Sequence, residues 1–391
     1  MPISKRIAEY QKKGSWIRKL FDEGAQMAAD GSGKPVYDFS IGNPDLEPPA
    51  EFKQILKDLL MSDEKGTHRY MSNVGYVETR QAVADSLAED HDLPFEADNI
   101  VMTVGAGGAI NVALKALLDI GEEVLAVAPY FVEYKFYTEN HGGVFATAMA
   151  AADFNLDVSA IEEKITDKTR VLIITNPNNP TGVLYPQETL NELGDMLRRK
   201  SEGRERPIFL IDDAPYRKLI YDVPKCTSAF KAYEYTLMGT SHSKDLGLPG
   251  ERIGFLAISP QMTNWRKVAG AAAFTNRTLG FVNAPALMQR VAGALQKVTI
   301  DLDWYRRKRD LLYNSLTEMG YEMPYPGGAF YIFPKAPGGD DIAFINKLKK
   351  LRVLVVPGSG FGTPGYFRIS YCVNDDRIKG ALPAFKEAIR K

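Results

Sequence analysis

The stretch of sequence that decides the fold runs from residue 241 to 254 and reads SHSKDLGLPGERIG. It follows Tyr235–Thr240, a short apolar run that predicts a buried strand. Three polar residues and then Lys244 therefore stand at the carboxyl end of a strand, where the ligands of open α/β sheets collect. The stretch also matches S-x-x-K, a motif of some acyl-transferring serine enzymes. The S-D-N and K-T-G triplets that accompany this motif are absent from the chain, so that interpretation fails.

The residues around this stretch alternate between short apolar runs and amphipathic runs. The runs predict strands at 100–104, 123–128, 144–148, 169–175, 207–211 and 253–258, and helices at 109–120, 132–140 and 187–200. Runs such as VLII at 171–174 are apolar without alternation, which is typical of strands covered on both faces. The strand–helix–strand order predicts an α/β fold with a mostly parallel, doubly wound sheet.

The pattern changes after about Asn283. Helices are expected at 284–295, 302–319, 342–351 and 375–390, with strands at 329–333 and 367–371, which together form an α+β unit. The first 45 residues predict one short helix and an extended segment at 36–41, and we expect them to pack with this unit. The chain is therefore expected to form a large domain over residues 46–286 and a smaller domain from residues 1–45 and 287–391.

Composition excludes several classes of protein. The chain has 391 residues, of which 45% are hydrophobic, and 48 Lys+Arg against 49 Asp+Glu give a formal net charge of −1. This balance excludes a disordered chain and gives no reason to expect nucleic acid or a membrane surface as partner. Cys226 and Cys372 are far apart and form no C-x-x-C pair, so neither a disulfide framework nor a metal site is expected. Without a signal peptide or an apolar run of membrane-spanning length, a cytoplasmic location is expected.

Two glycine-rich segments resemble nucleotide-binding motifs and fail in detail. GAGGAI at 105–110 follows a predicted strand and opens a predicted helix, but the third glycine of G-x-G-x-x-G would fall on Ile110. GSGK at 31–34 suggests a P-loop, but Pro35 stands where Ser or Thr is required, and a turn explains the segment better. Dinucleotide and nucleoside-triphosphate binding are therefore not predicted.

The wider sequence around Lys244 closely resembles the lysine segment of the pyridoxal-phosphate aminotransferases of the aspartate aminotransferase family, the class I/II enzymes of fold type I. The resemblance covers roughly residues 37–373, with the motifs in the family's order. Further matches are YMSNVGYVETR at 70–80, NPNNPTG at 176–182, DAPY at 213–216 and FRIS at 367–370. The resemblance implies an aminotransferase with the fold-type I architecture and pyridoxal 5′-phosphate as its cofactor.

Such a cofactor needs groups that anchor it and tune its electronics. The resemblance implies that Lys244 binds the cofactor covalently and then acts as general base, a role that requires an amine with a lowered pKa. It implies that Asp213 pairs with the pyridine nitrogen, while Tyr216 and Asn179 reach the ring hydroxyl. Asp212 is the rival of Asp213 for the acidic role, and the position of Tyr216, three residues after Asp213, favours Asp213.

The cofactor's phosphate requires backbone donors and a cation. Residues 105–107, which are Gly105, Ala106 and Gly107, offer free amides at the start of a predicted helix, where the helix dipole favours an anion. Ser241 adds a hydroxyl and Arg252 a planar guanidinium that suits phosphate oxygens. The resemblance adds Tyr70, which would reach the phosphate of a partner subunit in a homodimer with shared active sites. It also places Phe131 on the pyridine ring, although a core phenylalanine explains that residue too.

The substrates implied are an L-amino acid and a 2-oxo acid, such as 2-oxoglutarate. Arg368 stands in a strand-like stretch, where a buried arginine is costly without an anion, and the resemblance makes it the clamp for the substrate's α-carboxylate. Gly42 would lie beside the same carboxylate. Some aspartate-using members of the family carry a lysine at the position of Gly107, so the binding of a second carboxylate is left open. Arg277 has two interpretations. It is a cation from the partner subunit that takes the place of this lysine, or it is an ordinary surface charge.

Two other functions remain open at this point. One is a different pyridoxal-phosphate reaction on the same fold, such as that of a carbon–sulfur β-lyase. The other is a non-catalytic regulator that binds the cofactor. The complete set of matched polar residues, from Tyr70 to Arg368, favours an enzyme most similar to aspartate aminotransferase.

Overall fold

A seven-stranded sheet forms the centre of the computed structural model, which describes residues 2–13, 16–29, 31–62 and 65–390. Residues 1 and 391, the two ends of the expected small domain, lie outside the described part. The strands are β2 (Ile100–Thr103), β3 (Glu123–Ala128), β4 (Val144–Met149), β5 (Thr169–Thr175), β6 (Phe209–Asp213), β7 (Thr236–Ser241) and β8 (Gly254–Ile258). Their order in space is β2-β8-β7-β6-β5-β3-β4.

Five neighbouring strands, β7-β6-β5-β3-β4, run parallel, and β8 runs antiparallel to both β2 and β7. The prediction of an α/β fold with a mostly parallel sheet is confirmed. The reversal at β8 follows from its connection to β7, because residues 242–253 contain only the one-turn helix α10 (His242–Asp245) and a short 3₁₀ turn instead of a long crossover helix. Lys244 therefore lies in the connection where the sheet changes direction.

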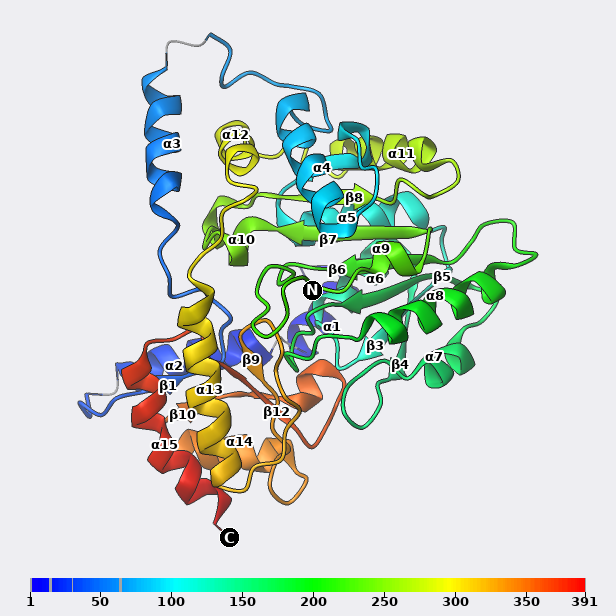
Figure 1. The fold of residues 1–391 in the computed structure, drawn as a ribbon. Coiled ribbons are helices and arrows are strands. Elements are labelled where there is room, and N and C mark those ends of the chain that lie inside the picture. Colours follow the sequence, from blue (N-terminus) through cyan, green and yellow to red (C-terminus); the bar gives the residue numbers. More distant parts are fainter. Residues whose placement is uncertain (1, 14–15, 30, 63–64, 391) are drawn as a thin grey trace.

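Helices cover both faces of the sheet, as Figure 1 shows. One face packs against α5 (Gly105–Leu117), α6 (Glu133–Asn140) and α11 (Trp265–Thr278). The opposite face packs against α4 (Val77–His91), α7 (Val158–Lys164), α8 (Gln187–Ser201), α9 (Ala229–Ala232) and α12 (Ala286–Ala294). Successive residues of a strand serve the two faces alternately: Val124 and Ala126 pack toward α5, and Leu125 and Val127 pack toward α8. This double burial explains the unbroken apolar runs of the sequence.

The C-terminal part of the chain builds a second core beside the sheet, at the lower left of Figure 1. Its elements are α13 (Leu302–Glu318), α14 (Asp341–Lys350), α15 (Asp375–Ile389), β9 (Tyr331–Ile332), β10 (Val353–Leu354), β11 (Val356–Pro357) and β12 (Phe367–Ser370). The strands β11-β12-β9 form an antiparallel sheet. This sheet places Arg368 between the second core and the carboxyl ends of the central strands.

The N-terminal segment joins the C-terminal part through a short strand. In β1 (Tyr37–Asp38), Tyr37 pairs in parallel with Val353 of β10. The expectation of one short helix in the first 45 residues is wrong, because α1 (Lys5–Lys13) and α2 (Trp16–Ala28) both form. Charged residues recur along these segments and interrupt the apolar pattern in the sequence. The short apolar face that contains Leu20 is therefore not evident from the sequence. A further helix, α3 (Ala50–Met61), has no buried residue and stands at the edge of the molecule beside α12.

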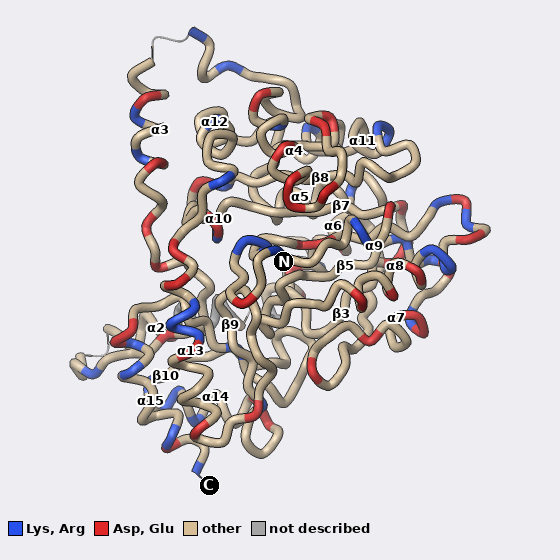
Figure 2. Tube along the Cα trace, in the orientation of Figure 1, with Lys and Arg blue, Asp and Glu red and all other residues tan. Residues whose placement is uncertain are grey.

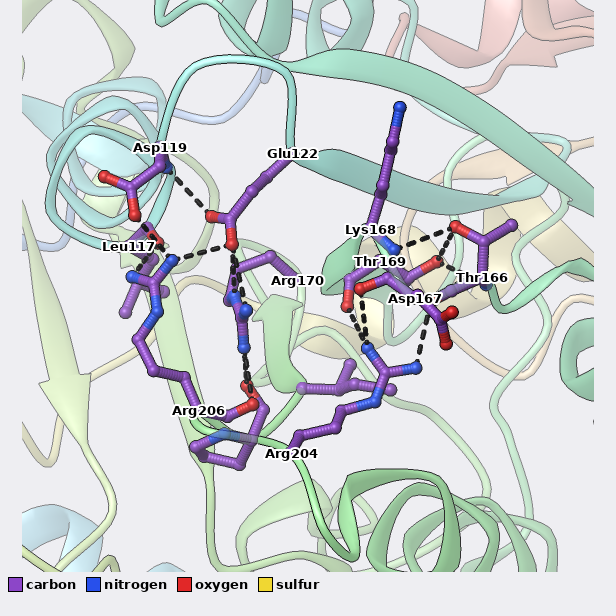
Figure 3. Close-up of polar contacts among 12 residues, drawn as sticks. Leu117, Asp119, Glu122, Thr166, Asp167, Lys168, Thr169, Arg170, Arg204 and Arg206 are labelled. Atoms are coloured by element: carbon purple, nitrogen blue, oxygen red, sulfur yellow. Dashed lines mark hydrogen bonds and ion pairs between the residues drawn. The ribbon is translucent and has the colours of Figure 1, made fainter.

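Charged residues of both signs occur along the outer helices, and few lie on the central strands (Figure 2). In the described part of the chain, no helix combines the length and the apolar character needed to cross a membrane. A dense ion-pair network lies at the amino ends of β3, β5 and β6 (Figure 3). There Glu122 accepts from Arg170 at 2.9 Å and from Arg206 at 2.7 Å, so that the amino ends of three neighbouring strands are held together.

Candidate active site

A cavity of about 310 Å³ opens at the carboxyl ends of β5, β6 and β7. Eleven of the residues singled out from the sequence line it: Gly42, Ala106, Gly107, Phe131, Asn179, Asp213, Tyr216, Ser241, Lys244, Arg252 and Arg368. The walls come from the central sheet, from α5 and α6, from the loop at residue 42 and from β12. Residues separated by more than 300 positions in the sequence thus meet at the edge where parallel strands present their ligand-binding ends.

Lys244 lies in α10, and its side chain reaches into the cavity. Its Nζ donates to the carbonyl oxygen of Gly42 at 2.6 Å and lies 5.4 Å from the centre of the Phe330 ring. Burial lowers the pKa of Lys244 to about 8, and the nearby Arg368 and Arg252 act in the same direction. About one fifth of this amine is therefore neutral near pH 7.4, far more than for a lysine with the reference pKa, and the neutral form is the one that acts as a nucleophile or a base.

Asp213 ends β6 and points toward the α5 face of the sheet, as Ile211 does. Its Oδ2 accepts a hydrogen bond from the hydroxyl of Tyr134, and that hydroxyl oxygen lies 2.7 Å from the Thr175 hydroxyl. The other oxygen, Oδ1, is buried and has no hydrogen-bond partner among the described residues. Burial raises the pKa of Asp213 to about 7, although the hydrogen bond from Tyr134 opposes the shift.

The rival carboxylate, Asp212, lies on the opposite face of the strand. It lines a separate cavity of about 430 Å³ together with Arg217 and Cys226, and it is absent from the lining of the cavity that contains Lys244. Burial raises the pKa of Asp212 to about 8. The alternation of side chains along β6 thus separates the two neighbouring acids.

Arg368 in β12 is only 2% exposed. Its Nη1 donates to Asn179 Oδ1 at 3.0 Å and its Nη2 to the Ser40 carbonyl at 2.7 Å, while the buried Nε has no partner among the described residues. The guanidinium lies over the rings of Tyr331, at 4.5 Å, and Phe361, at 4.9 Å. Packing on two aromatic rings fixes its plane, and N–H groups remain available for an anion.

The first turn of α5 has features that suit an anion. The amides there have no acceptor within the helix, and the helix dipole adds positive potential. Gly105 has φ +81°, and a Cβ atom on it would lie 3.0 Å from Nη2 of Arg252. The glycine therefore allows the guanidinium to approach the helix start, where Ser241 also lines the cavity.

Gly105, Tyr70 and Arg277 do not line the cavity of their own chain. Gly105 contacts Arg252 behind the lining of the cavity. Tyr70 is 91% exposed and lines a shallow depression with Phe281 and Asn283, so it is not part of the cavity of its own chain. Arg277 lies on α11 outside the cavity, with its guanidinium over the Phe274 ring at 5.2 Å.

Sequence reasoning missed several residues that face the cavity or its acids. Tyr134 and Tyr137 lie on α6 and continue a spacing of three residues that begins at Phe131, just before the helix, a pattern that indicates one helix face turned toward the site. Thr175 ends β5 directly before the NPNNPTG turn, which is the kind of position that drew attention to Asp213. Tyr331 gave no comparable signal, since it stands in an apolar run typical of a core strand.

Comparison with known proteins accounts for this arrangement. The family model described as aminotransferase class I and II matches residues 34–385. The chain belongs to this family. An amino transferase from Eubacterium rectale has a similar structure, with a TM-score of 0.95 and 40% identity over 99% of this chain and 98% of that one.

Two curated relatives show the range of activities near this sequence. An aspartate aminotransferase of Pyrococcus abyssi and an aromatic-amino-acid aminotransferase of Thermococcus litoralis are each 32% identical to the chain. In both comparisons 96% of this chain and 96% of the relative are covered. The protein is an aminotransferase, its substrates are amino acids and 2-oxo acids, and its cofactor is pyridoxal phosphate.

The residues of this aminotransferase fit that cofactor. A buried carboxylate with a free oxygen, an amine of lowered pKa and an anion-binding helix start surround one cavity. These three features match a ring nitrogen, an aldehyde and a phosphate, which are the polar parts of pyridoxal phosphate. In the described part of the chain, no three His, Cys, Asp or Glu side chains form a group that could hold a metal ion.

Proposed function

We propose that the enzyme transfers the amino group of an L-amino acid to a 2-oxo acid such as 2-oxoglutarate, with aspartate and aromatic amino acids as the first donors to test. The convergence of Lys244, Asp213 and Arg368 on one cavity is the observation that carries this proposal. The names of the two curated relatives support the choice of donors.

The proposed roles follow from the chemistry of each side chain. Arg368 binds the α-carboxylate of the substrate with a charge-assisted pair of hydrogen bonds and so orients the α-carbon. Lys244 first holds the cofactor covalently and then takes the proton from the α-carbon on its neutral Nζ. When bound, pyridoxal phosphate supplies a sink for the electrons left on that carbon. Because Nζ lies 2.6 Å from the Gly42 carbonyl, the amine has a defined position beside the proposed carboxylate site.

Asp213 is proposed to hold a proton on the ring nitrogen through the oxygen that Tyr134 leaves free. Tyr216 and Asn179 are proposed to bind the ring hydroxyl, and Phe131 to stack on the ring. Gly105, Ala106, Gly107, Ser241 and Arg252 are proposed to bind the phosphate. Support comes from the lining of the cavity, which contains all of these residues except Gly105.

We further propose that the enzyme is a homodimer in which Tyr70 completes the phosphate site of the partner subunit. The exposure of Tyr70, together with exposed Val77, Phe274 and Met61 on nearby elements, supports an interface on this side of the molecule. The division into residues 46–286 and residues 1–45 with 287–391 also remains a proposal, supported by the separate core around Phe39. The cytoplasmic location stays a prediction.

The test of the proposed function begins with the purified enzyme and one substrate at a time. Incubation with an amino donor alone should convert the cofactor absorbance and release one equivalent of oxo acid, and a second oxo acid should restore it. Borohydride reduction followed by peptide mapping should locate the cofactor on Lys244. Elimination products in place of the oxo acid would contradict transamination.

Subunit complementation tests the proposed dimer. Tyr70→Phe and Lys244→Ala would impair different composite sites, so subunit exchange between the two variants should yield dimers with one site intact in both residues. Activity should rise on mixing toward roughly a quarter of the wild-type value, because statistical exchange makes half of the dimers mixed and each mixed dimer has one intact site of two. Mixed dimers, verified by mass, that stay inactive would refute the sharing of sites.

A further inference from the structure

The active-site cavity contains four residues with charged side chains: Asp213, Lys244, Arg252 and Arg368. The proposed function assigns all four to the cofactor or to the substrate's α-carboxylate. The other residues that line the cavity carry no charge, and several are aromatic or aliphatic. The side chain of the substrate therefore meets neutral groups of this chain, and the selectivity that this chain supplies depends on shape and on neutral hydrogen bonds.

Tyr137 brings a hydroxyl to the cavity beside the first turn of α5. A Cβ atom on Gly107 would lie 3.1 Å from the Tyr137 Oη, so this hydroxyl takes the space that a side chain at position 107 would use. Tyr137 lies three residues after Tyr134 on α6, and both rings therefore lie on the face that is turned toward the site. The small residue on one helix and the large phenol on the other are complementary in shape.

The Tyr137 hydroxyl is available as a hydrogen-bond donor. It makes no hydrogen bond with any residue in the described part of the chain, although the ring is partly buried. Burial raises the pKa of Tyr137 to about 12, and the nearby Glu133 and Asp213 act in the same direction. The phenol therefore keeps its proton near neutral pH, and a donor enclosed in a cavity favours a ligand that brings an acceptor.

We propose that Tyr137 is a specificity-determining residue, whose hydroxyl donates a hydrogen bond to an oxygen acceptor at the far end of the substrate's side chain. The substrate class is an L-amino acid whose side chain ends in a carboxylate, an amide or a hydroxyl. A neutral donor bonds to each of these, whereas a cation would favour the carboxylate alone. The inference rests on the proposed function, since it takes Arg368 as the clamp for the other end of the substrate.

Tyr137→Phe removes the hydroxyl and keeps the ring. The probes are succinate and butyrate, which differ only in the exchange of one carboxylate for a methyl group, and their dissociation constants are measured on the cofactor-loaded enzyme by calorimetry. The variant should bind succinate about tenfold more weakly, as expected for the loss of one hydrogen bond to a charged group, and butyrate within about twofold of wild type. The kcat/KM for aspartate should fall by a similar factor relative to that for 2-aminobutyrate, which carries a methyl group in place of the second carboxylate.

Tyr130→Phe is the matched control, because Tyr130 stands just before α6 and does not line the cavity. It should leave both dissociation constants unchanged. The inference is overturned if wild-type enzyme binds succinate no more tightly than butyrate, or if Tyr137→Phe alters neither ligand. It is also overturned if both ligands weaken equally while the affinity for pyridoxal phosphate falls, since the hydroxyl would then serve the phosphate. An absence of transamination in the wild type would refute the proposed function, and the succinate-to-butyrate ratio would still test Tyr137.

Discussion

The two ends of the central sheet differ in how completely their charged groups are paired. At the amino ends of β3 and β5, Glu122 is shared by Arg170 and Arg206, and Arg170 also donates to the Pro207 carbonyl at 2.9 Å (Figure 3). At the carboxyl ends, Asp213 keeps a buried oxygen without a partner, and Lys244 is held by a single carbonyl. The same sheet thus carries a saturated polar network at one end and an incomplete one at the other.

The pKa values of the charged groups at the two ends reflect this difference in pairing. Burial acts to raise the pKa of Glu122, but the Asp119 amide and the two guanidiniums outweigh it, and the pKa is lowered. At the opposite end, burial raises the pKa of Asp213 to about 7 and lowers that of Lys244 to about 8. Paired charges favour folding. An unpaired buried charge lowers the stability of the fold, but it remains available to bind a ligand. Substitutions at the two ends should therefore separate activity from stability.

The largest effect is expected from Lys244→Ala. Loss of the amine removes both the covalent anchor and the proposed base, so transamination should fall by roughly 10⁴-fold or more, while the fold persists. Single-turnover kinetics with saturating amino donor would measure this, and circular dichroism would check the fold. Lys168→Ala, at the amino end of β5, is the matched control and should keep near wild-type activity. An active Lys244→Ala enzyme would contradict the assignment.

The next effect distinguishes two neighbouring acids. Asp213→Asn removes the carboxylate that faces the Lys244 cavity, and kcat should fall by roughly 10²–10³-fold, as expected when a positioned proton-holding group is lost. Asp212→Asn changes a carboxylate on the other face of β6 and should leave kcat within about threefold. Steady-state rates with one donor at several pH values would measure both. Equal losses of kcat in the two variants would show that the strand face on which an acid lies does not decide which acid serves the cofactor.

Much of this contrast could be predicted from the sequence. The strands of the sheet were predicted correctly because double burial demands continuous apolar runs, and the polar residues that follow them mark the ligand-binding end. The direction of β8 could not be predicted in this way, since a buried strand has the same composition whether it runs parallel or antiparallel. The sequence predicts only one short helix where α1 and α2 both form, because charged residues recur along both segments.

Other parts of the site depend on packing that the sequence does not display. Tyr134 and Tyr137 look like the buried face of an amphipathic helix, and only the packing of α6 against α5 and β4 turns them toward Asp213 and Gly107. The choice between Asp212 and Asp213 rests on a one-residue alternation that a small error in strand register would reverse. The network at the amino ends was not predicted, because its arginines bind carbonyl groups of distant loops.

Arginine-to-lysine exchange at the two ends should have opposite consequences. Arg368→Lys keeps the charge and loses the planar fork, so kcat/KM should fall by about 100-fold for amino acids, and much less for amines without a carboxylate. Arg170→Lys loses donors to the Arg206 and Pro207 carbonyls and should lower the free energy of unfolding by about 1–3 kcal/mol, with activity nearly unchanged. Enzyme assays and urea unfolding of both variants would measure the contrast. An Arg170→Lys variant with impaired catalysis and intact stability would refute the division between the ends.

The smallest effect is a pH dependence of the cofactor-free protein. The folded-state pKa of Glu122 lies below its unfolded value, so its contribution to stability is present above about pH 4 and is lost as the pH falls further. Asp213 behaves in the opposite way. Its folded pKa of about 7 lies above the unfolded value, so the folded state binds the extra proton, and stability falls as the pH rises from about 4 to 7.

Asp213→Asn removes this titration and should flatten the decline between about pH 4 and 7. Asp212, whose pKa is raised to about 8, and His91, whose pKa burial lowers to about 4, contribute to the remaining slope in opposite directions. Asp195→Asn, an exposed carboxylate on α8, is the control and should leave the slope as it is in the wild type. Urea unfolding of the cofactor-free proteins between pH 4 and 8 measures the difference. A slope that Asp213→Asn leaves unchanged would mean that Asp213 is already ionised in the folded protein, and the contrast between the two ends of the sheet would then rest on Lys244 alone.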